Sequence, residues 1–243
     1  MAYQHGRAGK STREMAKKRR NDAIWIAVFG IITIIILWFF LENSKAFGIG
    51  GVGILVLLVL IRIIPNFVER GADKKFREEK RAIRGAQAEE KVGNILANLS
   101  TDFYVLHDIE SPYGNIDHIV IGKNNGIFLL ETKAHGGKVT IEGDTLLVNA
   151  KLPEKDFIAQ CLRNTYWLRD EVEKVVGLKP WISPILVFTN AFVSATGPVK
   201  GVRIVNKKYL STLLNRTTQS NALNAKVWDH RKDVGIKIGF RLS

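Results

Sequence analysis

Two long apolar segments near the N-terminus most constrain how this chain can fold. The first, Ile24–Leu41, reads IWIAVFGIITIIILWFFL and carries no charge. The second, Gly48–Ile64, reads GIGGVGILVLLVLIRII, and its one charged residue, Arg62, lies near the end. Each is close to the roughly 20 apolar residues that cross a bilayer as a helix. We therefore expect a two-helix transmembrane hairpin over residues 24–64, with Pro65 ending the second span. The alternative is a buried helical hairpin in a soluble protein.

The residues that flank these segments predict a topology. Residues 1–23 form a basic arm, disordered on the simplest interpretation, and residues 65–84 form a charged juxtamembrane linker or helix. The link Glu42–Phe47 is short and nearly neutral. Because basic flanks stay in the cytoplasm, we expect both termini on the cytoplasmic side of the cell membrane. The single cysteine, Cys161, fits that reducing compartment. The net charge of +13 favours anionic partners, namely nucleic acid, lipid or both.

A β-hairpin is the clearest feature of the remaining sequence. Two strand-like runs, Ile116–Gly122 and Ile127–Lys133, flank the residues KNNG at 123–126. Asn-Gly between apolar runs is a strong hairpin signal. A hairpin here can bring a residue of the first run, Asp117, beside the end of the second.

A hairpin of this kind can bring three charged residues to one face. Glu131 and Lys133 project together because residues i and i+2 of a strand lie on the same side, and Asp117 can lie beside them. Two carboxylates so close repel each other unless a proton or a cation lies between them. The pattern therefore predicts a divalent-metal site, and the alternative is an ordinary hairpin with solvated charges.

The spacing D-x(13)-E-x-K resembles the core of PD-(D/E)xK nucleases, and the longer string GNIDHIVIGKNNGIFLLETKAHGG is similar to the nuclease-related domain (NERD) family. The resemblance implies a Mg²⁺- or Mn²⁺-dependent nuclease acting on DNA or RNA. Asp117, Glu131 and the Thr132 carbonyl would then hold the metal, which neutralises phosphate charge and activates water. Lys133 would orient or deprotonate that water.

The resemblance also implies two further site residues. The family's first helix carries G-x-x-G-E, and residues 85–89 read GAQAE, which departs only at Ala88. Glu89 would be the acidic residue of that helix, although it could equally be a surface glutamate. Gln160 lies on a predicted helix, Lys155–Val176, where the family has a glutamine, and it would contact phosphate or the active site. An exposed helical glutamine is the alternative there.

The order of predicted elements indicates an α/β fold in which helices flank a mixed central sheet, as in a restriction-endonuclease-like core. We expect this nuclease-related domain to span residues 85–215 and a C-terminal extension to span residues 216–243.

Other functions fit the sequence less well. His107, His118 and His135 could suggest zinc, but their spacing matches no standard site, and His118 should face away from Asp117. The chain lacks the P-loop, G-x-G-x-x-G and G-x-S-x-G motifs, so no nucleotide cofactor is expected. A channel is disfavoured because the spans carry no charge at mid-membrane. The remaining alternative is an inactive, membrane-anchored module that binds nucleic acid or another partner.

Overall fold

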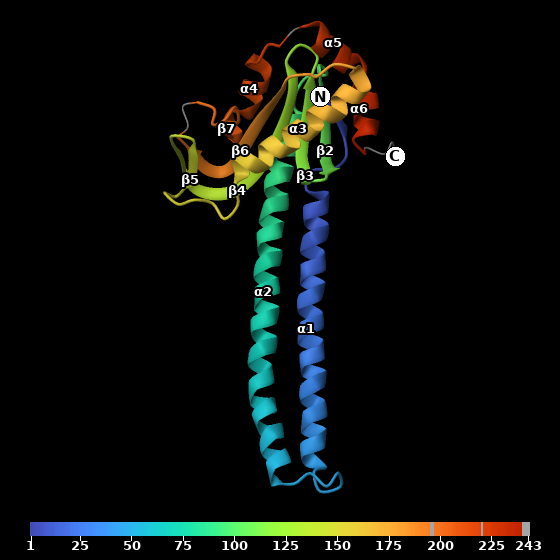
Figure 1. The fold of residues 1–243 in the computed structure, drawn as a ribbon, viewed down its shortest axis with the longest axis vertical. Helices are drawn as coiled ribbons and strands as arrows, with labels where there is room; N and C mark the ends of the chain where they lie inside the picture. Colours follow the sequence, from blue (N-terminus) through green and yellow to red (C-terminus); the bar gives the residue numbers. More distant parts are fainter. Residues whose placement is uncertain (195–196, 220, 240–243) are drawn as a thin grey trace. The chain divides into compact units, whose positions relative to one another are not determined.

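The computed structural model describes residues 1–194, 197–219 and 221–239 (Figure 1). The chain divides into two compact units, Thr12–Ile83 on the one hand and Met1–Ser11 with Arg84–Ser243 on the other. In chain order the elements are β1 Tyr3–His5, α1 Lys10–Glu42, α2 Gly51–Ala97, β2 Phe103–Ser111, β3 Gly114–Gly122, β4 Gly126–Glu142, β5 Thr145–Val148, α3 Phe157–Val176, β6 Ile182–Val193, β7 Arg203–Asn206, the 3-10 helix η1 Lys207–Tyr209, α4 Leu210–Arg216, α5 Ala222–Asp229 and α6 Arg231–Lys237.

The unit Thr12–Ile83 is a pair of long helices, formed by most of α1 and the first part of α2. Both helices are long and apolar enough to cross a membrane, with mean hydropathies of 2.8 and 2.4 over their most apolar windows. Their apolar side chains are largely exposed, which suits a lipid environment. A Cβ atom at Gly30 would lie 2.5 Å from Val68 Cγ2, so glycine allows the two helices to approach closely there. The pair fits the expected hairpin.

Two expectations about this region are wrong. The arm expected to be disordered instead forms β1, which pairs in parallel with β2, and α1 already begins at Lys10. Asp108 of β2 accepts hydrogen bonds from the main-chain nitrogen of Ser11 at 3.0 Å and from its hydroxyl at 2.5 Å, which satisfies a donor in the first turn of α1. Pro65 lies inside α2 and does not end it. The residues after it are rich in Glu, Lys and Arg, which favour helix, and the helix continues through them despite the roughly 3 kcal/mol cost of a proline.

The sheet has the strand order β1-β2-β3-β4-β6-β7, and β5 pairs with β4. Strands β2, β3 and β4 are antiparallel neighbours, whereas β4, β6 and β7 run parallel. The predicted hairpin is β3–β4, and its turn residue Gly126 has a positive φ of 91°. The preceding residue, Asn125, donates hydrogen bonds from its side-chain amide to three main-chain carbonyls. These belong to Leu214 and Asn215 at the end of α4 and to Thr217 just after that helix.

Helices cover both faces of this sheet. On one face α3 lies across the strands (Figure 1), and its residues Cys161, Leu168 and Val172 join the larger core cluster. On the other face the end of α2 and helix α4 pack against the strands through Val92, Leu96, Leu210 and Leu214. The result is the mixed α/β fold that the sequence predicts.

Two short helices, α5 and α6, lie within the expected C-terminal extension. Helices α5 and α6 place Val227 and Val234 in the same core cluster as α3. Residues 220 and 240–243 of the expected extension lie outside the described residues.

Candidate active site

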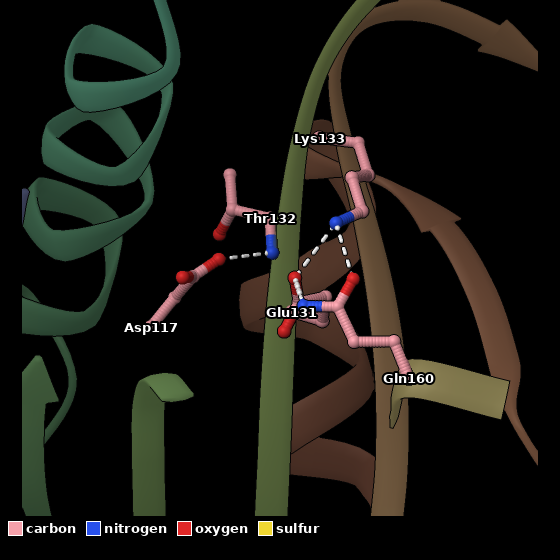
Figure 2. Close-up of polar contacts among 5 residues, drawn as sticks. All are labelled: Asp117, Glu131, Thr132, Lys133 and Gln160. Carbon is pink, nitrogen blue, oxygen red and sulfur yellow. Dashed lines mark hydrogen bonds and ion pairs between the residues drawn. The ribbon is translucent and has the colours of Figure 1, made fainter. Parts of the chain in front are cut away.

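The candidate site lies where the β3–β4 ladder ends. The last paired residues are His118 and Leu130, and beyond them β4 continues to pair with β6. Asp117 comes just before His118 in β3 and so lies just beyond the ladder. Its Oδ2 accepts a hydrogen bond from the main-chain nitrogen of Thr132 at 2.5 Å (Figure 2). The carboxylate therefore satisfies a β4 main-chain donor just past the end of the ladder.

A compact polar triangle joins β4 to α3. Lys133 Nζ lies 2.7 Å from Glu131 Oε1 and donates to Gln160 Oε1 at 3.3 Å. Gln160 Nε2 also donates to Glu131 Oε1, at 2.8 Å. Figure 2 shows these three side chains converging at β4, with Asp117 on the other side of the β4 ribbon. The i, i+2 pattern thus brings Glu131 and Lys133 together as expected, and α3 adds Gln160.

The start of α3 fixes the side chains around Lys133. Asp156 caps this helix by accepting a hydrogen bond from the Ala159 nitrogen at 2.9 Å. The first residue of the helix, Phe157, lies under the Lys133 ammonium, which is 4.6 Å from the ring centroid. Such a cation–π contact stabilises the ammonium when water is excluded. The Lys133 side chain is accordingly only 13% exposed.

The electrostatics of the site favour a bound cation. Burial raises the pKa of Asp117 well above its usual value, and the nearby Glu131 and Glu89 carboxylates raise it further. The Lys133 charge and the Thr132 N–H act in the opposite direction without cancelling these effects. An acid with a raised pKa among other acids binds a proton or a metal ion readily, because either relieves the repulsion.

The unsatisfied oxygens at the site fit a divalent cation. Within the described part of the chain, Glu131 Oε2 and Thr132 Oγ1 are buried without a hydrogen-bond partner. Carboxylate oxygens are the ligands that Mg²⁺ and Mn²⁺ prefer. The described residues contain no group of three His, Cys, Asp or Glu side chains arranged to hold a metal. Main-chain oxygen, such as the Thr132 carbonyl, would therefore have to complete the ligands supplied by Asp117 and Glu131.

Glu89 lies on α2 and is buried, with 8% of its surface exposed. Its charge contributes to the raised pKa of Asp117, so the helix does bring this carboxylate near the strand carboxylates. A side chain buried to this extent is not a surface glutamate, so that alternative is wrong.

The three histidines do not form one site. His107 and His118 are buried side by side on β2 and β3, with their Nδ1 atoms 2.8 Å apart. Burial lowers the pKa of His107 to about 4 and that of His118 well below its usual value, so both are neutral near pH 7. His135 instead lies beside Phe157, with their ring centroids 5.3 Å apart and the rings tilted by 55°. In the described residues they form no zinc cluster.

Two residues near the site were missed from sequence. Phe157 lies three positions before Gln160, and this spacing puts both on one side of a helix, so the pattern could have identified it. Cys161 follows Gln160 and is buried. Burial raises the pKa of its thiol, so Cys161 stays protonated and is not a nucleophile.

Part of the chain matches a known protein family. Residues 84–189 match the family described as nuclease-related domain, which is a little under half of the chain. The matched stretch contains every candidate site residue, from Glu89 on α2 to Gln160 on α3. No curated protein and no solved structure matches the chain.

Proposed function

Residues 84–189 of this chain are a nuclease-related domain, and from this premise we propose that the protein is a membrane-anchored, metal-dependent nuclease. Its substrate is DNA or RNA, and it hydrolyses phosphodiester bonds on the cytoplasmic side. The observation that carries the proposal is the Glu131 carboxylate. One of its oxygens is bound by Lys133 and Gln160, and the other is buried with no hydrogen-bond partner among the described residues. Asp117 is close enough to be affected by the Glu131 charge.

A phosphodiester is difficult to hydrolyse. Its anionic oxygens repel an attacking nucleophile, so a catalyst must supply positive charge. A Mg²⁺ or Mn²⁺ ion held by Asp117, Glu131 and the Thr132 carbonyl would offset that charge and lower the pKa of a water molecule. Because burial and the neighbouring carboxylates raise the pKa of Asp117, a metal ion would compete with a proton for this carboxylate. Glu89 adds negative charge, which strengthens the attraction for a divalent ion.

The other residues orient and activate water. Lys133 would orient the attacking water and, in its neutral form, would accept the proton of that water. Gln160 bridges Lys133 and Glu131, so it keeps the amine aligned with the carboxylate. Phe157 covers one side of the amine and limits the access of bulk water.

Membrane anchoring is the second part of the proposal. The apolar segments of two helices that could span a bilayer precede the matched domain, and basic residues flank the outer ends of both segments. The positive-inside rule then leaves both termini and the nuclease-related domain in the cytoplasm. The helices would hold the site near the membrane without taking part in the reaction.

An inactive binding module is the second candidate. It is favoured by the Lys133–Glu131 ion pair, because an ammonium already neutralises one of the two strand carboxylates without any metal. A domain that only binds nucleic acid could keep such a pair as a structural contact.

A cleavage assay separates the two candidates. The full chain, purified in detergent, is incubated with single- and double-stranded DNA and RNA, in the presence of Mg²⁺, Mn²⁺ or EDTA. We expect cleavage of at least one substrate with Mg²⁺ or Mn²⁺ and none with EDTA. Binding without cleavage under every condition would contradict the nuclease proposal and support the binding module.

A further inference from the structure

A hollow lies on the α3 face of the domain, and none of the site carboxylates lines it. It has a volume of about 300 Å³ and is formed by the middle of α3, the start of β6 and the turn before β7. Its floor is apolar and includes buried Ile182 and Pro184. Its rim carries two large aromatic side chains that remain exposed, Tyr166 at 52% and Trp181 at 67%. Exposed aromatic rings beside an apolar hollow are unfavourable in water and mark a binding surface.

We propose that this hollow binds an unstacked base of a single-stranded nucleic acid. A nucleobase is a flat aromatic ring, and the faces of Tyr166 and Trp181 offer the stacking surfaces that single-strand-binding proteins use. Pro180 is buried next to Trp181, and its ring restricts the chain that carries this indole.

The charges around the hollow fit a phosphate backbone. Three cationic residues line it, namely Arg169, Lys179 and Lys200. Arg169 lies over the Tyr166 ring, 5.2 Å from its centroid, so one side chain can approach both a base and a phosphate. Lys179 pairs with Glu173 at 3.5 Å and with Asp170 at 3.8 Å. Lys179 and Asp170 are exposed and Glu173 is partly exposed, and surface pairs of this kind contribute little, so phosphate oxygens can replace the two carboxylates.

A row of side chains on α3 connects the hollow with the candidate active site. Gln160, Arg163 and Tyr166 are spaced three residues apart, so they form one oblique ridge on the helix. Gln160 contacts Lys133 and Glu131, Arg163 is exposed, and Tyr166 lines the hollow. Neighbours at this spacing are about 5–6 Å apart, so the ridge covers roughly 10–12 Å. A single strand lying along it places a base in the hollow and a phosphate near Glu131, with Arg163 on the backbone between them.

This inference rests on the proposed function and narrows its substrate. A duplex keeps its bases stacked inside and cannot insert one into the hollow without losing a base pair. The hollow therefore favours single-stranded DNA or RNA, or a duplex with an unpaired end. We call the ridge and the hollow together the single-strand track.

Fluorescence anisotropy on the full chain in detergent tests the track. EDTA is present so that no strand is cut. The probes are a labelled thymidine homopolymer, an abasic strand of the same length and a blunt duplex. The variants are Trp181→Ala, Tyr166→Ala and Arg163→Ala. The control is Tyr113→Ala, which removes an equally exposed ring, at 53%, from the turn between β2 and β3.

Each aromatic variant should weaken binding of the homopolymer by between about fivefold and 150-fold, the range for loss of one base–aromatic stack. The same variants should leave the affinity for the abasic strand nearly unchanged, because that strand has no base to stack. Arg163→Ala should weaken homopolymer and abasic strand alike and reduce the salt dependence of binding by about one ion. Tyr113→Ala should match the wild type.

The track is overturned if Trp181→Ala and Tyr166→Ala bind the homopolymer like the wild type, or if the wild type prefers the duplex. Its failure differs from that of the proposed function. A wild type that binds single strands through these rings but cuts nothing refutes the nuclease and leaves the track standing. If the wild type cuts nucleic acid while the aromatic variants bind normally, the track is refuted and the nuclease proposal stands.

Discussion

Lys133 Nζ lies 2.7 Å from Glu131 Oε1, and the two side chains are only 13% and 4% exposed. The residues are two positions apart on β4, so the strand itself holds them on one side. A pair this buried stabilises the fold only while both members remain, because either one alone is an uncompensated charge away from water.

Replacing Lys133 with alanine should therefore destabilise the domain in a way that metal relieves. We expect the free energy of unfolding to fall by about 3 kcal/mol in EDTA, near the usual cost of breaking a buried ion pair. Added Mg²⁺ should recover part of the loss, since the ion neutralises Glu131 in place of the ammonium. Urea unfolding followed by circular dichroism measures both values. Lys91→Ala, at an exposed position of α2, is the control. An equal loss with and without Mg²⁺ would argue against a metal at Glu131.

The buried histidine pair should make stability depend on pH. The folded pKa of His107 is about 4 and its ordinary value is 6.5, so the unfolded chain binds a proton more readily between these values. Stability should thus be full above about pH 6.5 and fall towards pH 4, by up to about 3 kcal/mol from His107. The lowered pKa of His118 acts in the same direction. His107→Gln should flatten this loss, whereas His230→Gln, at a partly exposed position, should not. An unchanged pH profile in His107→Gln would refute the assignment.

Nucleic-acid affinity should fall steeply as salt rises. The chain carries a net charge of +13, and binding phosphates with lysine and arginine releases counterions. Anisotropy titrations between roughly 50 and 200 mM salt should show affinity dropping by several powers of ten if six or more phosphates are contacted. Salt-independent binding would instead point to a protein or small-molecule partner.

The proposed topology can be tested with introduced cysteines. Lys45→Cys lies in the link between α1 and α2, and Asp144→Cys lies in the exposed turn between β4 and β5. An impermeant thiol reagent added to intact cells should label Lys45→Cys but not Asp144→Cys. The native Cys161 is buried and gives little background. The reverse labelling pattern would place the domain outside the cell.

The sequence predicted the fold where local signals were strong. The Asn125-Gly126 turn between apolar runs identified the β3–β4 hairpin, and the apolar spacing of α3 identified that helix. Local sequence signals did not predict the elements whose formation depends on tertiary packing. Pro65 lies within α2 because helix-forming residues continue on its far side, and α5 and α6 are too short to show a period. Strand β4 also extends beyond the predicted run Ile127–Lys133, because it continues through Gly136 with a register shift against β6.

The candidate site was predictable in part for the same reason. The i, i+2 rule places Glu131 beside Lys133, and the hairpin register carries Asp117 to the same end of β4. That Asp117 would bind the Thr132 nitrogen could not be read from sequence, because it depends on where the β3–β4 ladder ends. The approach of Glu89 and Gln160 was implied only by family resemblance, because distances between elements are set by the packing of α2 and α3 on the sheet.

The most direct test of the account measures cleavage and Mn²⁺ binding together for the wild type and Asp117→Asn, with Asp144→Asn as a surface control. Asparagine can still accept the hydrogen bond of the Thr132 nitrogen, and it removes a repulsion, so the fold should be kept or slightly stabilised. The account predicts that Asp117→Asn loses cleavage and binds Mn²⁺ at least tenfold more weakly, a change of about 1.4 kcal/mol, while the control matches the wild type. Cleavage by Asp117→Asn at the wild-type rate, with contaminating nuclease excluded, would contradict it.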